Sequence, residues 1–595
     1  MIVLIGCVHL KKKSIGQSFI KGTIVLTSSI FIVKILGILF RIFVTGMIGA
    51  TGAAYFNVAY EIYNPLFALA TAGLPIAISR MVSENMAKAR YKDVRLIHKV
   101  SIPIFLTTGS IGFLLMVLGA LFVPRLPFIN IPGAIYSVLA LAPTIFFACL
   151  MSIYRGYHQG LRDTVPTAIS EIIEASCKFF IGYAISFSII KFGMDEYASK
   201  GTAFGTPCSS KELALEVIMP FASAGAIIGI SFGAFMGFLY LIICHKRRGD
   251  GITEEEISEA PKPRDKKILI KTLVSTAMPI GIGAIIMNVA GLIDTTLILN
   301  RIQNIMATNP QGLLSFYGSK IANEMLLSKG GVHGFLLGCY SFTLPIMMLV
   351  PAITQVFGVV SLPAVTAAYT KKNKLELKKN IESVLKMTTL VTIPAGIGIS
   401  LLGPSLLSIL YPHKLTEVSI ASNIIPFLGI ATALTATSIP LCSMLQAVGR
   451  VDLPVKMISL GLLIKIVVNY MLVGVPSINI QGAGIGTIAG YCFILLVSIY
   501  FLIKETKIIP NFKVTILKPL IGGIICGATA FVVNSFMNKF CNRMFSLLFA
   551  VFIAIIIYFV ALFLLRAVTV DDIKSLPKGE SILKLYNEIF LKGKK

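Results

Sequence analysis

Tryptophan and charged residues are scarce in this sequence. Its 595 residues include no Trp and are only 13% charged, while 56% are hydrophobic and the mean hydropathy is +0.85. A soluble domain needs a far more polar surface, so this composition excludes a soluble globular protein. The apolar stretches are each about 20 residues or longer, enough to cross a hydrocarbon core of about 30 Å. The sequence therefore predicts an all-α polytopic membrane protein.

The sequence also lacks the motifs of nucleotide hydrolysis and of metal binding. No G-x-x-x-x-G-K-[ST] motif occurs, which excludes a P-loop ATPase within the chain. The ten cysteines form no C-x-x-C pair and have no zinc-ligand spacing. We therefore expect no disulfide, no metal site and no cofactor.

Acidic residues are few: the sequence contains 27 Asp and Glu residues and 53 Lys and Arg residues. Its formal net charge is therefore +26. The basic residues lie in short, separate clusters, the richest at 80–99, 246–271 and 371–379, and we therefore expect no nucleic-acid partner. Short cytoplasmic loops of membrane proteins retain positive charge. The distribution of Lys and Arg between alternate loops therefore predicts that both termini lie in the cytoplasm.

Apolar length between charged residues, Pro and Gly predicts about fourteen membrane spans. We place them near 22–46, 53–79, 99–123, 133–156, 166–190, 216–244, 271–300, 332–366, 382–404, 418–445, 454–475, 482–503, 515–537 and 545–566. The predicted domains are a first lobe of six spans, a mobile cytoplasmic linker, a second lobe of six spans, and the last two spans with a cytoplasmic tail. Their respective bounds are 1–245, 246–270, 271–505 and 506–595.

The two lobes show signs of duplication. Pro75 in the second span and Pro363 in the eighth each follow a Leu, and they are separated by the same 288 positions as Arg162 and Arg450. Because each lobe has an even number of spans, both enter the membrane from the same side. We therefore expect the lobes to be related by an axis along the membrane normal, with a central cavity between them.

Ionisable side chains inside a span cost a few kcal/mol unless they face a partner or water, so each is a functional candidate. Lys34 and Arg41 are seven residues apart on the first span and form a cationic stripe suited to a phosphate; snorkelling of Arg41 is the alternative. In the second span Asn57, Glu61 and Asn64 share one face, suited to a sugar or an ion, or to structural hydrogen bonds.

Further candidates lie in later spans. Glu171, Glu174 and Lys178 share a face of the fifth span, and we expect Glu174 to pair with Lys178. Glu171 is then a candidate gate or proton site, or simply a solvated helix end. Asp294, in the outer half of the seventh span, is a candidate ligand for a coupling cation, with a structural role as the alternative. Lys465 is expected to snorkel or to neutralise a neighbouring charge.

Several motifs resemble those of one known family. They are Lys34-Ile35-Leu36-Gly37, Ala72-Gly73-Leu74-Pro75, Tyr154-Arg155-Gly156-Tyr157-His158-Gln159-Gly160 and Pro166-Thr167-Ala168. With them, most of the chain resembles the MurJ and stage V sporulation protein B branch of the multidrug/oligosaccharidyl-lipid/polysaccharide (MOP) exporter superfamily. The resemblance implies two six-helix lobes facing a central cavity, two further helices forming a groove for a lipid tail, and alternating access.

The function implied by this resemblance is a flippase in the bacterial plasma membrane. Its cargo would be a polyprenyl-diphosphate-linked sugar, in the first place lipid II for peptidoglycan synthesis. Lys34 and Arg41 would hold the diphosphate, and Arg155 with Arg80 would form the cytoplasmic gate. Expected partners are the lipid-linked sugar, membrane lipids and cell-wall synthesis proteins, and energy would come from a Na⁺ or H⁺ gradient or the membrane potential.

The chain departs from this family in one respect that concerns the cargo. Members that flip lipid II carry cavity arginines in the second and eighth spans, whereas no Lys or Arg occurs between Ala53 and Ser79 or between Val332 and Phe357. Another lipid-linked oligosaccharide, such as an exopolysaccharide or spore-cortex precursor, is therefore an alternative cargo.

Two other functions remain open. A drug or cation antiporter of the same superfamily would place more weight on Glu61 and Asp294. A membrane-embedded glycosyltransferase would need an external acid–base cluster, and the longer outer loops, 191–215 and 301–331, contain no such motif that we recognise. We therefore expect a transporter rather than an enzyme.

Overall fold

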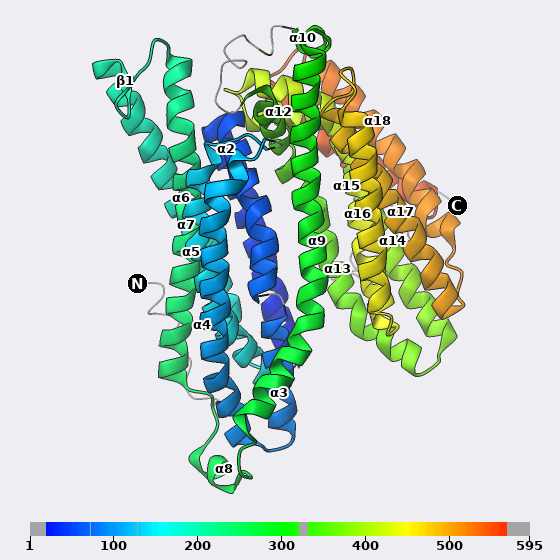
Figure 1. Cartoon of the computed structure of the whole chain (residues 1–595). Coiled ribbons are helices and arrows are strands. Elements are labelled where there is room, and N and C mark those ends of the chain that lie inside the picture. The colour runs from blue at the N-terminus through cyan, green and yellow to red at the C-terminus, as the bar shows by residue number, and fades with distance from the viewer. Residues whose placement is uncertain (1–18, 72, 128, 319–320, 322–330, 568–595) are drawn as a thin grey trace, which may run out of the picture. The chain divides into compact units, whose positions relative to one another are not determined.

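The computed structural model of the chain describes residues 19–71, 73–127, 129–318, 321 and 331–567 (Figure 1). Residues 1–18 and 568–595, which make up most of the predicted cytoplasmic ends, lie outside the described residues. Within the described part, strands are limited to the two-residue pair β1 (Thr202–Ala203) and β2 (Thr206–Pro207), which pair antiparallel. The predicted all-α class is confirmed.

The helices follow the apolar runs of the sequence. They are α2 (Phe19–Thr71), α3 (Leu74–Ala87), α4 (Tyr91–Phe122), α5 (Ala134–Gly160), α6 (Val165–Lys200), α7 (Lys211–Arg248), α8 (Glu254–Glu259), α9 (Lys266–Thr308), α10 (Pro310–Tyr317), α12 (Gly331–Ser341), α13 (Leu344–Thr370), α14 (Lys374–Leu410), α15 (Leu415–Ala447), α16 (Asp452–Val473), α17 (Gln481–Thr506), α18 (Lys518–Met537) and α19 (Arg543–Leu564), with the short turns η1 (Val123–Arg125) and η3 (Lys513–Leu517). Twelve helical segments among the described residues are long and apolar enough to cross a membrane. The chain is therefore a multi-pass membrane protein, while the total of fourteen crossings stays a prediction.

The chain divides into two compact units. The first comprises Met1–Pro345, Leu410–Ile424 and Ile458–Gly490. The second comprises Ile346–Ile409, Ile425–Met457 and Tyr491–Lys595. This division follows packing within the structure, so the predicted division into two related lobes stays a prediction.

In the first unit, α2 contains the turn between the first two predicted spans. Gly49 has φ 66° and ψ −169°, a conformation that residues with a Cβ rarely adopt. Arg41 hydrogen-bonds Asn57, sixteen residues further along, yet residues sixteen apart on a straight helix would be separated by about 24 Å. The chain therefore folds back at Gly49, and α2 is a hairpin of two helical spans, as the apolar runs predict.

Helices α4, α5, α6 and α7 pack together in the same unit. Helix α6 packs along α7, α7 against α5, and α5 against α4 (Figure 1). A Cβ on Gly229 of α7 would lie 2.3 Å from backbone atoms of Gly182 on α6, so this contact requires glycine. Such close backbone approach is typical of helix pairs in membranes. The β1 hairpin and α8 lie at opposite ends of these helices, as expected for loops on opposite sides of a membrane (Figure 1).

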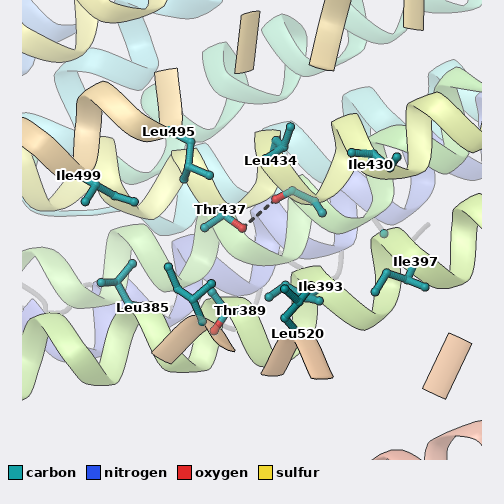
Figure 2. Close-up of a pocket in the computed structure, with 13 residues that line it drawn as sticks. Leu385, Thr389, Ile393, Ile397, Ile430, Leu434, Thr437, Leu495, Ile499 and Leu520 are labelled. Atoms are coloured by element: carbon teal, nitrogen blue, oxygen red, sulfur yellow. Dashed lines mark hydrogen bonds between the residues drawn. The ribbon is translucent and has the colours of Figure 1, made fainter. Parts of the chain in front are cut away.

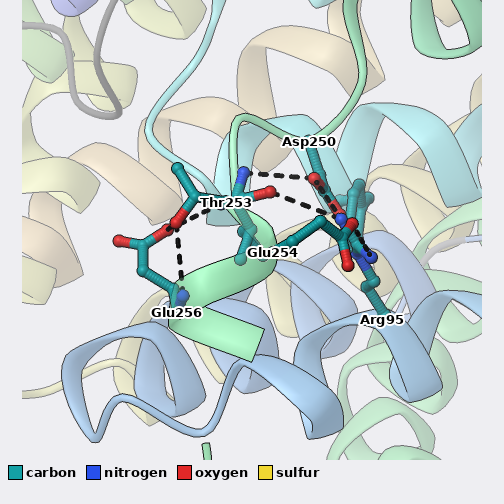
Figure 3. Close-up of polar contacts among 7 residues, drawn as sticks. Arg95, Asp250, Thr253, Glu254 and Glu256 are labelled. Atoms are coloured by element: carbon teal, nitrogen blue, oxygen red, sulfur yellow. Dashed lines mark hydrogen bonds and ion pairs between the residues drawn. The ribbon is translucent and has the colours of Figure 1, made fainter. Parts of the chain in front are cut away.

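The linker between α7 and α9 is attached to α4 by charged side chains (Figure 3). Arg95 Nε lies 2.7 Å from Asp250 Oδ2, and Arg95 Nη1 lies 3.4 Å from Glu254 Oε1. Burial alone would raise the pKa of Asp250, but hydrogen bonds from Arg95 and from the Ile252 backbone N–H lower it below its ordinary value. The charged form of Asp250 is thus stabilised by its partners.

A second set of contacts continues this attachment. Asp93 Oδ1 accepts a hydrogen bond from the Arg264 backbone N–H at 2.7 Å, and Lys92 Nζ donates to the Ala260 carbonyl at 2.7 Å. Helix α8 begins with a capping box between Thr253 and Glu256, drawn in Figure 3. In this structure charged side chains of α4 hold the linker, contacts that the polarity of residues 246–270 alone did not indicate. The mobility expected of the linker stays a prediction.

In the second unit, α18 and α19 pack against each other and against α14. A Cβ on Gly527 would lie 2.4 Å from Ile397 Cγ2, so α18 approaches α14 closely at this glycine. Tyr558 Oη donates a hydrogen bond to the Leu390 carbonyl at 2.8 Å, which ties α19 to α14. The last two helices therefore form part of the second unit.

Candidate functional site

The two cations of the first span lie two helical turns apart on the first half of α2. Lys34 is exposed, and it makes no hydrogen bond or ion pair with any of the residues that the structure describes. Arg41 is partly buried; its Nη2 donates to Asn57 Oδ1, and its Cζ lies 4.7 Å from the centre of the Phe56 ring. The guanidinium is therefore held in place, whereas the Lys34 ammonium is available.

The position of Arg41 depends on a chain of hydrogen bonds. Asn57 accepts from Arg41 and donates from Nδ2 to Ser341 Oγ, and Ser341 Oγ donates to the Leu337 carbonyl at 2.9 Å. Asn57, expected to contact the substrate, thus orients Arg41 in this structure. The sequence pointed to Asn57 but not to Ser341, because a single Ser in an apolar helix gives no distinctive signal.

Glu61 lies one turn beyond Asn57 on α2 and faces α9. A Cβ added to Gly291 of α9 would lie 3.0 Å from Glu61 Oε2. The charged side chains that act on Glu61 are Lys465, Asp294 and Arg41. The structure therefore brings Glu61 and Asp294, proposed from separate spans, into one electrostatic environment.

Asp294 is paired rather than free. Lys465 Nζ on α16 lies 2.8 Å from Asp294 Oδ2, and Asn469 Nδ2 donates to Asp294 Oδ1. The expectation that Lys465 neutralises a neighbour is confirmed. A coupling cation at Asp294 would have to replace the Lys465 ammonium, so a coupling role of Asp294 stays a prediction.

An aromatic face lies beside these polar residues on α2. The Phe56 and Tyr60 rings stack with centroids 4.9 Å apart, and the Tyr63 and Phe67 rings stack at 5.1 Å. Asn64 makes no hydrogen bond to any part of the chain that the structure describes. The predicted arrangement of a polar face next to an aromatic one is therefore present, with Asn64 as its unengaged amide.

The predicted pair between Glu174 and Lys178 was wrong. Glu174 Oε2 instead lies 2.9 Å from Arg155 Nη2 of α5. Lys178 Nζ donates to Tyr60 Oη at 3.4 Å and lies 4.9 Å from the centre of the Phe40 ring. The i, i+4 rule considers one helix alone, whereas α5 supplies a guanidinium and α2 supplies aromatic faces that bind the Lys178 ammonium.

The remaining gate and coupling candidates are separate from Arg41. Glu171 Oε2 accepts a hydrogen bond from Ser29 Oγ at 3.4 Å, and the charge of Arg155 also acts on Glu171. Arg80 is exposed on α3 and has no acidic partner within ion-pair distance among the described residues. The structure thus groups Arg155 with Glu171 and does not bring Arg80 into that group.

The second unit contains an apolar cavity of about 310 Å³. Side chains from α14, α15, α17 and α18 surround it, among them Leu385, Ile430, Ile499 and Leu520 (Figure 2). The hydroxyl of Thr437 is satisfied within its own helix, since it donates to the Ala433 carbonyl at 2.7 Å. The lining is therefore suited to hydrocarbon, and the volume is at the lower end for small-ligand pockets.

Sequence comparisons find two family models and several curated proteins to which the chain is similar. A family model described as "Polysaccharide biosynthesis protein" matches residues 19–194, and the MatE model matches residues 319–471. Lipid II flippase MurJ of Bacillus subtilis (strain 168) is 24% identical over 81% of this chain and 82% of its own length. Stage V sporulation protein B of the same organism is 21% identical over 94% of this chain and 98% of its own length.

Solved structures show the same fold. A structure of lipid II flippase MurJ in an inward closed conformation has a TM-score of 0.57 at 16% identity, covering 90% of this chain and 98% of that one. An inward-facing multidrug resistance MATE family transporter of the MOP superfamily also has a TM-score of 0.57, at 14% identity over 85% of this chain and 98% of that one. The predicted resemblance is confirmed: the chain is a homologue of MurJ and of stage V sporulation protein B, with the fold of the MOP superfamily transporters.

Proposed function

We propose that the protein is a flippase that moves a polyprenyl-diphosphate-linked sugar from the inner to the outer leaflet of the bacterial plasma membrane. Lipid II, used in peptidoglycan synthesis, is the first candidate cargo, and another lipid-linked oligosaccharide is the second. The homology to a lipid II flippase supports this class of cargo. The protein would act as a transporter and not as an enzyme.

The observation that carries the proposal is the pair of cations on the first half of α2. A sugar diphosphate cannot cross hydrocarbon unaided, because removing its charges from water without compensation is very unfavourable. Lys34 is free to bind one phosphate, and Arg41 is held by Asn57 for a second. Charge-assisted hydrogen bonds of this kind are about twice as strong as neutral ones.

The polyprenyl tail would remain in an apolar environment throughout. The cavity in the second unit is lined by aliphatic side chains and hydroxyls such as that of Thr437, which already donate to backbone carbonyls. Such a lining offers no competing polar contact to a hydrocarbon chain. We propose that it receives part of the tail.

Gating and coupling complete the proposal. We assign Arg80 and Arg155 to the cytoplasmic gate, with Arg155 acting through its ion pair to Glu174. Glu171 and Asp294 are assigned to coupling with a Na⁺ or H⁺ gradient or with the membrane potential. Glu61 and Asn64 would line the sugar path on the second half of α2.

The first test is depletion of the protein in its host while lipid II at the outer face of intact cells is measured. External lipid II should fall while the inner pool rises. Plasmid-encoded Lys34→Ala or Arg41→Ala should restore flipping at least about tenfold less efficiently than wild type, since a lost charged hydrogen bond costs about 1.5–3 kcal/mol.

Lys378→Ala is the matched control, because this lysine is half-exposed on α14 in the second unit. It should restore flipping fully. Normal flipping by both Lys34→Ala and Arg41→Ala would contradict the assignment of the diphosphate site. Unchanged lipid II on depletion would direct the assay to other polyprenyl-linked glycans, and drug-dependent proton or sodium exchange would support the antiporter alternative.

A further inference from the structure

Two buried hydrogen-bond donors in the first unit have no partner. They are Arg41 Nε and the hydroxyl of Tyr411, and neither bonds to any described atom. Tyr411 is only 2% exposed. Leaving a buried donor without an acceptor is unfavourable, so two such donors need an explanation.

The surroundings of Tyr411 bring its ring to α2. The residue lies in the short turn between α14 and α15, and a Cβ on Gly46 of α2 would be 3.2 Å from Tyr411 Cδ1. Its ring packs edge-on against Phe342 with centroids 4.5 Å apart. Phe342 directly follows Ser341, so the same short segment supports both Tyr411 and the hydrogen-bond chain that orients Arg41.

The two orphan donors belong to one electrostatic neighbourhood. The Arg41 charge interacts with the phenol of Tyr411. Burial raises the pKa of Tyr411 well above its ordinary value, although Arg41 opposes this, so the group keeps its proton and remains a donor. Arg41 Nη2 is already engaged by Asn57, which leaves Nε as an unused donor.

We propose that Arg41 Nε and Tyr411 Oη form a subsite for one phosphate group of the cargo, a subsite that rests on the proposed flippase function. Both atoms are enclosed in the present conformation, so the subsite fills when a conformational step of the transport cycle opens it. A phosphate oxygen would then accept from both donors at once. Asn57 and Ser341 act as positioning residues, because they hold the guanidinium without using its Nε.

Tyr411→Phe tests this subsite, since it removes one oxygen atom and keeps the ring that packs on Gly46. The full-length protein in detergent would be titrated with farnesyl diphosphate, and binding followed by the shift in thermal unfolding temperature. Farnesyl diphosphate should bind the variant about tenfold more weakly than wild type. Without ligand, the variant should unfold at the same or a slightly higher temperature, because it has lost an unsatisfied hydroxyl.

Two further variants separate the subsite from the rest of the proposal. Tyr500→Phe, at an exposed tyrosine of the second unit, should bind like wild type. Arg41→Lys keeps the charge but lacks the Nε donor, so adding Tyr411→Phe to it should weaken binding by clearly less than tenfold.

The outcomes distinguish the two hypotheses. Equal binding by wild type and Tyr411→Phe, with binding lost in Arg41→Ala, would overturn the subsite and leave the flippase proposal intact. Absence of binding to wild type would overturn both. A merely structural role of Tyr411 would lower the unfolding temperature of Tyr411→Phe without changing its affinity for farnesyl diphosphate, and this result would overturn the subsite.

Discussion

The ion pair between Lys465 and Asp294 illustrates how a single residue controls a buried charge. Both side chains are mostly buried, with 18% and 11% exposure. In such a setting the attraction between the charges offsets much of their desolvation, but loss of one partner leaves the other uncompensated. The pair therefore explains how an acid can be kept inside the seventh predicted span.

Lys465→Met should lower the free energy of unfolding by about 3 kcal/mol, because Asp294 would remain buried without its cation. Thermal unfolding of the purified protein in detergent measures this. The double variant Lys465→Met, Asp294→Leu should regain most of the loss. Lys456→Met, at a 70% exposed lysine of the same helix, is the control and should change stability by less than about 0.5 kcal/mol. A double variant no more stable than Lys465→Met would contradict this account.

At the scale of elements, the turn within α2 determines the position of the whole candidate site. Gly49→Ala should destabilise the protein by about 1–3 kcal/mol, since φ is 66° there. The added Cβ would also lie 2.9 Å from Lys414 Nζ. Gly37→Ala is the matched control on the same helix, with no atom within 4 Å of the added Cβ, and should be neutral or slightly stabilising. Equal unfolding temperatures for the two variants would exclude a strained turn.

The attachment of the linker to α4 should depend on pH. The pKa of Asp250 is lowered on folding, so its contribution to stability is present above the ordinary value of 3.8 and is lost as the pH falls through the lowered folded value. Asp250→Asn should therefore cost about 1 kcal/mol at pH 7. The difference from wild type should shrink below about pH 4. Chemical unfolding at several pH values measures this, with Glu255→Gln on α8 as the control; a difference that persists at low pH would contradict the assignment.

At the scale of the whole molecule, the sequence predicts helices better than contacts between helices. The α2 hairpin follows from two apolar runs on either side of Gly49, and the polar face of Asn57 and Glu61 follows from helical periodicity.

The partners Ser341, Lys465 and Tyr411 come from segments far away in the chain. Periodicity within one helix carries no information about such partners, which is also why the pairing of Glu174 with Arg155 was missed.

The orientation of the whole chain can be tested with one native cysteine. Cys541 lies in the turn between α18 and α19 and is exposed, unlike the other described cysteines. With the amino terminus inside and fourteen spans, this turn is outside, whereas the linker at Ser258 is inside.

A membrane-impermeant maleimide should therefore label Cys541 in intact cells and should fail to label Cys541→Ser. Ser258→Cys, introduced into the Cys541→Ser background, should react only after permeabilisation. The two sites are separated by the seventh to thirteenth predicted spans, an odd number of crossings. Reversed labelling would invert the orientation inferred from the basic loops. Labelling of both sites from the same side would require an even number of crossings, and one predicted span between α9 and α18 would then not cross the membrane.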